Sequence, residues 1–192
     1  MNHIAIAAAA SALMIGAGAG SLSNAGAPAA QNEMTNPMVG GQAMLPGQTI
    51  AENAAHSPDH TTLVAALRKT GLVETLAGKG SYTIFAPTNA AFAAVPGGAE
   101  ALLKDKGRLA KVLGYQIVRG RYDSQTLLKM ISQNGGTAKL KTLEGGTIAA
   151  MLNGPTNIVL VDEKGNVADI AIYDVYQANG VMQVTDKVAL PG

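Results

Sequence analysis

The chain has 192 residues, of which 47% are hydrophobic and 14% are charged, and it contains no cysteine. This composition is typical of a folded protein, because disordered chains combine low hydrophobicity with high net charge. A formal net charge of +1 and an aromatic content of 4% provide neither strong attraction to phosphates nor many rings for base stacking, so we expect no nucleic-acid partner.

Residues 1–29 have the pattern of a secretory signal peptide. The small-residue apolar stretch IAIAAAASALMIGAGAG is followed by Ala-x-Ala patterns, which predict cleavage after Ala27, Ala29 or Ala30. The alternative is an uncleaved membrane anchor, which would need about 20 strongly apolar residues. We therefore expect a periplasmic, secreted or cell-surface protein. It would have no membrane span after signal cleavage, and no lipid attached through a cysteine.

Residues 30–47 mix Pro, Gly, Asn, Gln and Met without periodicity, which predicts a flexible lead-in. The folded domain is then expected over residues 48–192. Its first clear helix follows Ser57 as N-cap and Pro58 at the first helical position, and Gly71 is expected to end it.

The segment YTIFAPTNAAF, residues 82–92, predicts a sharp corner between a strand and a helix. Pro87 has no backbone N–H and ends the strand pairing, and Thr88 can cap a helix that starts at Asn89. Within the strand, Ile84 is expected on one face and Phe85 on the other.

The remaining elements are two helices over 99–114 with a break at Gly107, a helix near 124–133, and then strands. Turns at 144–146 and 164–166 predict two hairpins, and residues 181–190 predict a last strand. Helices early and strands late, without regular alternation, favour an α+β fold.

Four segments in order resemble the fasciclin domain family. YTIFAPTNAAFAAVP and ANGVMQVTDKVALP are similar to its two signatures, VLGYQIVRGRY to its central Tyr-His segment, and TIAENAAHSPDHTTLVAALRKTGL to its first helices. The resemblance implies two packed β-sheets forming a wedge, with several helices along one side. The structural signature residues are then Phe85, Pro87, Thr88, Asn89, Asn179, Gly180 and Asp186.

The resemblance also implies a function in adhesion, through surface contacts with a matrix, polysaccharide or cell-surface partner. Gln116 replaces the histidine of the Tyr-His pair, and Gln183 replaces a histidine of the last strand. The positions that match the family's binding segments, or lie beside them, are Tyr115, Gln116, Arg119 and Arg121, with Asp174 and Val175 as a second candidate. A protein or polysaccharide partner and a monomeric chain are expected.

The alternative function is a periplasmic binder of a small apolar ligand, held between the sheets and the helices. Catalysis and metal binding would have to use His56 or His60, the two histidines beyond the leader, with Asp59 between them. All three lie at a helix start, where polar residues need no further role, so we expect no enzyme activity, no metal and no cofactor. The basic run from Lys104 to Arg121 is interpreted as a solvated face, the alternative being a patch for an acidic polysaccharide.

Overall fold

The computed structural model describes residues 36–78 and 80–192. The predicted signal peptide and the first residues of the lead-in lie outside this part. In chain order the elements are β1 (Met38–Val39), β2 (Gln42–Ala43), α1 (Ile50–His56), η1 (Pro58–His60), α2 (Thr61–Thr70), α3 (Leu72–Ala77), β3 (Tyr82–Pro87), α4 (Asn89–Ala93), α5 (Gly98–Lys104), α6 (Lys106–Tyr115), β4 (Ile117–Arg119), α7 (Ser124–Gln133), β5 (Thr137–Lys141), β6 (Thr147–Leu152), β7 (Ile158–Val161), β8 (Val167–Gln177) and β9 (Gly180–Thr185). Over these described ranges, no helix is long and apolar enough to cross a membrane.

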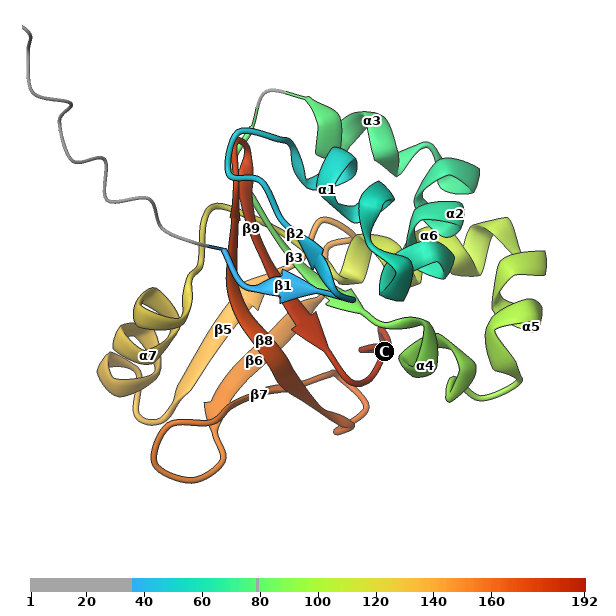
Figure 1. Ribbon diagram of the computed structural model, residues 1–192. Coiled ribbons are helices and arrows are strands. Elements are labelled where there is room, and N and C mark those ends of the chain that lie inside the picture. Colours follow the sequence, from blue (N-terminus) through green and yellow to red (C-terminus); the bar gives the residue numbers. More distant parts are fainter. Residues whose placement is uncertain (1–35, 79) are drawn as a thin grey trace, which may run out of the picture. The chain divides into compact units, whose positions relative to one another are not determined.

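The main sheet is a seven-stranded ladder in the order β4-β3-β9-β8-β7-β6-β5. Its neighbours are antiparallel except β3 and β9, which run parallel. The edge strands β4 and β5 approach each other at a bridge between Val118 and Thr142, so the ladder curls until it nearly closes (Figure 1). The long strand β8 pairs with both β7 and β9 and thereby joins the two halves of this α+β fold.

Two hydrophobic cores lie on opposite faces of β3. Ile84 packs with Phe92, Leu109 and other apolar residues of the helices in the first core. Phe85, the next residue, packs in the second core, inside the curled sheet. This alternation is the one that the strand pattern predicts. Helices α1–α6 cover one side, whereas α7 lies apart from them against β5 and β6 (Figure 1).

The predicted corner is confirmed. Strand β3 ends at Pro87, and the Thr88 hydroxyl accepts a hydrogen bond from the backbone N–H of Ala91 at 3.3 Å, which caps α4. Phe92 is fully buried one turn later. The two predicted hairpins are also present, as β5–β6 and β7–β8.

Residues 36–47 differ from the expected flexible lead-in. They include the β1–β2 hairpin, in which Val39 is fully buried, and Met44 just after it is nearly so. The Asn36 amide donates to the carbonyl of Tyr176 at 2.6 Å and accepts from its N–H at 2.8 Å. This hairpin is therefore fixed to β8 by bonds between residues far apart in the chain, which a local pattern does not reveal.

Three boundaries also differ in detail. The break between α5 and α6 lies at Asp105 rather than Gly107, because the Asp105 carboxylate caps α6 by accepting from the Arg108 N–H at 3.0 Å. The last strand ends at Thr185, and the residues beyond it are irregular. The Ser57 hydroxyl bonds to the ring of His60 at 2.9 Å instead of capping a helix N–H.

Candidate functional site

The second signature fastens helices to the sheet. The Asn179 side-chain oxygen accepts from the N–H of Ile50 at 2.9 Å, and its amide donates to the carbonyl of Leu76 at 2.5 Å. Asn179 thus provides a hydrogen-bond partner for a backbone N–H in the first turn of α1 and for a backbone carbonyl at the end of α3. Beside it, a Cβ on Gly180 would lie 2.0 Å from the carbonyl oxygen of Tyr82, so only glycine fits there.

The first signature has a similar structural role. The Asn89 side chain accepts from the N–H of Thr62 and donates to the carbonyl of Pro58, both at 2.9 Å, which joins the start of α4 to the start of α2. Asp186 accepts from the N–H of Asp169 at 2.7 Å. These signature side chains form hydrogen bonds with other parts of the same chain.

Three of the residues predicted to bind a partner are buried. Tyr115 and Val175 are fully buried and Gln116 is 1% exposed. Their side chains therefore cannot form an exposed contact face, and the expectation of such a face is corrected for these positions. Arg119 and Arg121 are exposed, and a role for them stays a prediction.

Asp174 lies at an irregularity of β8, where the register with β9 shifts between Ile172 and Val175. Its φ of 57° is in the left-handed region, which few residues other than glycine adopt. The carboxylate accepts from the N–H of Ser124 at 2.7 Å, from the Ser124 hydroxyl, and from the amide of Gln183 at 2.9 Å. Asp174 therefore anchors the start of α7 to the sheet.

Tyr115 and Gln116 position two segments that follow much later in the chain. The Tyr115 hydroxyl donates to the carbonyl of Thr147 at 2.6 Å and accepts from the N–H of Glu163 at 3.1 Å. Burial is the main cause that raises the pKa of Tyr115 to about 12, and the nearby carboxylates add to it. The Gln116 amide donates to the carbonyl of Ala189 at 2.5 Å. The pair thus holds the β7–β8 turn and the segment after β9.

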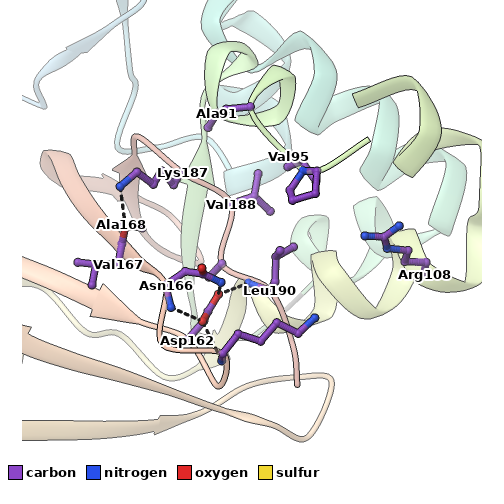
Figure 2. A pocket seen from close by; sticks show the side chains of 14 residues that line it. Ala91, Val95, Arg108, Asp162, Asn166, Val167, Ala168, Lys187, Val188 and Leu190 are labelled. Atoms are coloured by element: carbon purple, nitrogen blue, oxygen red, sulfur yellow. Dashed lines mark hydrogen bonds between the residues drawn. The ribbon is translucent and has the colours of Figure 1, made fainter. Parts of the chain in front are cut away.

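These two segments form one side of a pocket of about 560 Å³, and the region from α4 to Pro96 forms the other (Figure 2). The apolar part of its lining comes from both sides. It consists of Ala91, Ala94, Val95, Pro96, Val167, Ala168, Val188, Ala189 and Leu190.

Cations surround this apolar lining. Arg108, Lys164 and Lys187 all line the pocket and are exposed. A smaller hollow of about 190 Å³ shares Arg108, Lys164 and Leu190 with it and adds Lys111. Asp162 is the one acidic residue among the described residues that line the larger pocket.

His60 is part of the core. Its ring is fully buried, with Nδ1 2.9 Å from the Ser57 hydroxyl and Nε2 3.4 Å from the carbonyl oxygen of Ala86. Burial lowers the pKa of His60, and the contact with the Ala86 carbonyl opposes this effect in part. Over residues 36–78 and 80–192, no cluster of three or more histidine and acidic side chains could hold a metal ion.

Comparison with known proteins identifies the family. The fasciclin domain model matches residues 58–191, more than half of the sequence. The chain belongs to the fasciclin domain family.

Curated relatives of this fasciclin domain are bacterial and animal. Protein sll1483 of Synechocystis sp. is 36% identical over 148 residues, which cover 74% of this chain and 73% of the relative. Immunogenic protein MPB70 of Mycobacterium bovis is 33% identical over 148 residues, covering 74% and 68%. Transforming growth factor-beta-induced protein ig-h3 of Sus scrofa is 33% identical over 130 residues, covering 67% of this chain but 17% of the relative.

A solved structure confirms the fasciclin fold. The FAS1 domain pair from the insect cell adhesion molecule fasciclin I matches with a TM-score of 0.66 at 16% identity, over 74% of this chain and 51% of that chain. This chain thus spans about half of a protein that holds two such domains. At this identity the likeness shows the fold alone.

Sequence reasoning offered a ligand site between sheets and helices as an alternative, but it missed the residues that line the pocket of this fasciclin domain. Apart from Arg108, these residues come from three segments far apart in the chain, around 91–96, 162–168 and 187–190. The basic run from Lys104 to Arg121 was a partial indication of the pocket, because Arg108 lines it. Arg119, however, pairs with Tyr82 at the opposite end of β3 from α4, so the run does not form a single patch.

Proposed function

We propose that this chain is an exported binding protein that attaches to a matrix, polysaccharide or cell-surface partner through its outer surface. Family membership supports the proposal, and one 33% identical relative is named cell surface glycolipoprotein MPB83. The observation that carries it is an exposed pair of cations, Arg119 and Arg121. The Arg121 guanidinium donates to the carbonyl of Gln177 at 2.9 Å, which limits its motion.

Binding rather than catalysis also fits the state of the histidines. Both ring nitrogens of His60 face internal partners, so its ring is not available to a substrate. General acid–base chemistry needs a group within hydrogen-bond reach of the reacting atoms. His56 is exposed at the end of α1 and is not among the residues that line the pocket.

The test is a binding array of glycans and matrix proteins, read at low and high salt. We expect Arg119→Glu with Arg121→Glu to abolish a signal that high salt also weakens, because exposed charges are screened. Arg68→Glu, on the exposed face of α2, is the matched control and should keep the signal. Equal binding by all three proteins would reject the Arg119–Arg121 surface, and no binding by any of them would reject the adhesive function.

A second candidate function is binding of a small ligand with an apolar part, and the pocket beside α4 favours it. Its volume of about 560 Å³ lies within the range of natural ligand pockets, about 300–1,000 Å³. The pocket lies between helices and sheet, the place expected for such a ligand.

A further inference from the structure

We propose that the pocket beside α4 binds a single-chain amphiphile with an anionic headgroup, such as a medium-chain carboxylate. The inference rests on the second candidate function and adds the chemical class of the ligand. It follows from the apolar residues of the lining, the placement of the cations, and the internal hydrogen bonds of the one carboxylate in the pocket.

The apolar part of the lining, nine residues from both sides of the pocket, suits an alkyl chain. Val95 from the helical side faces Val188 and Leu190 from the segment after β9 (Figure 2). Apolar surface that a ligand covers here leaves water, which favours binding by roughly 25 cal/mol per Å². A ligand made only of charged groups would leave this surface unused, so the lining selects a molecule with an alkyl part.

Two of the three cations, Arg108 and Lys164, are placed for one headgroup at the end of such a chain. Arg108 and Lys187 lie on opposite sides of the pocket, with Val188 and Leu190 between them (Figure 2). The Lys187 ammonium donates to the carbonyl of Val167 at 2.9 Å and is held against the sheet. Arg108 and Lys164 line both hollows, so the anion is placed beside these two residues. An arginine guanidinium suits a carboxylate, which it can bind with two hydrogen bonds.

The carboxylate of Asp162 opposes this charge only in part. One oxygen accepts from the N–H groups of Lys164 and Asn166, at 2.9 and 2.8 Å. The other accepts from the Asn166 amide and from the N–H of Leu190, both at 2.9 Å. Hydrogen bonds from four N–H groups surround this charge, and three cations line the same pocket. The lining therefore has a net positive charge, which favours an anionic ligand.

The experiment measures binding of four probes to the whole chain by calorimetry. Decanoate is the proposed ligand class, decanol lacks its charge, decyltrimethylammonium reverses it, and acetate lacks its alkyl chain. We expect decanoate to bind at least about tenfold more tightly than each of the others, a difference of about 1.4 kcal/mol.

Two variants locate the site. Arg108→Glu with Lys164→Glu should weaken decanoate about tenfold or more, while decanol changes little. Ala94→Trp places a ring at an exposed position of the lining and should block decanoate. Its matched control is Ala65→Trp, on the exposed face of α2. The chain has no other tryptophan, so each variant's fluorescence also reports that it is folded.

Several outcomes would overturn the inference. Equal affinities for decanoate and decanol would show that the pocket does not select an anionic headgroup. Unchanged decanoate binding in folded Ala94→Trp would place the ligand elsewhere. Binding to vesicles with anionic lipids, without binding of free decanoate, would make the region a membrane contact instead. If decanoate does not bind, the adhesive function is not affected, because that function is tested separately with variants of the Arg119–Arg121 surface.

Discussion

The carboxylate of Asp162 accepts a hydrogen bond from the backbone N–H of Leu190 at 2.9 Å. The same carboxylate accepts from the N–H groups of Lys164 and Asn166 in the β7–β8 turn. One buried side chain thus holds the turn and the segment after β9 as a single unit. This unit forms one side of the pocket.

Replacing Asp162 with alanine should separate the two segments. The substitution leaves four partly buried N–H groups without this acceptor, and we expect a loss of about 2 kcal/mol in the free energy of unfolding. Urea denaturation measures this loss, and hydrogen exchange at the Leu190 N–H should become faster. Asp162→Asn keeps one oxygen acceptor and should lose less. Equal stability of Asp162→Ala and the parent would contradict this role.

Replacing Gly180 with alanine should disrupt the parallel pairing of β3 and β9. The new methyl group would lie 2.0 Å from the carbonyl oxygen of Tyr82, and the backbone would have to move. We expect a loss of about 3 kcal/mol or failure to fold. Gly47→Ala is the control, because no atom lies within 4 Å of its added Cβ. Thermal unfolding followed by circular dichroism compares the two, and a normal melting curve for Gly180→Ala would refute the close approach.

His60 should make the protein less stable in mild acid. Its pKa in the folded state is lowered by burial, so below the unfolded value of about 6.5 the unfolded chain binds more protons. Stability is complete above that pH and falls as the pH drops toward the folded pKa. The lowered pKa values of Glu52 and Glu163 act at more acidic pH, below about 4.5. A change in stability between pH 7 and pH 5 therefore reports the protonation of His60.

Urea denaturation at pH 7.5 and at pH 5.0 measures this effect. The difference between the two pH values should shrink in His60→Gln and persist in His56→Gln, whose side chain is exposed. An unchanged difference in His60→Gln would assign the acid sensitivity to other groups.

Replacing Gln177 with methionine should stabilise the protein. The Gln177 side chain is 2% exposed, and neither of its polar atoms has a hydrogen-bond partner within the described residues. Methionine has a similar size and no polar group that needs a partner, so we expect a gain of about 1 kcal/mol in the free energy of unfolding. The melting temperature provides the measurement. A lower melting temperature would mean that the amide has a partner, such as a buried water molecule.

The parts of the fold that were predictable depend on local chemistry. Pro87 and Thr88 define the corner because one lacks an N–H and the other supplies a cap, both within a few residues. The αL conformation of Gly71 ends α2 for the same kind of reason. Such signals need no knowledge of distant residues.

The parts that were not predictable depend on contacts between distant residues. The position of residues 36–47 depends on hydrogen bonds between Asn36 and Tyr176. The pocket brings Arg108 together with three other separate segments. Tyr115 and Gln116 resemble a family segment, but the resemblance did not reveal that they are buried. A sequence pattern shows which residues matter more readily than it shows which way their side chains point.

The parallel pairing of β3 with β9 has a consequence for how the chain folds during synthesis. Tyr82 pairs with Gly180 and Pro87 with Thr185, so an inner strand of the sheet lacks one neighbour until almost a hundred further residues have left the ribosome. Contacts over such separations form slowly because a long loop must close first. The nascent chain therefore presents an open strand edge while about half of its residues are translated, a period in which a chaperone or the export machinery could engage it.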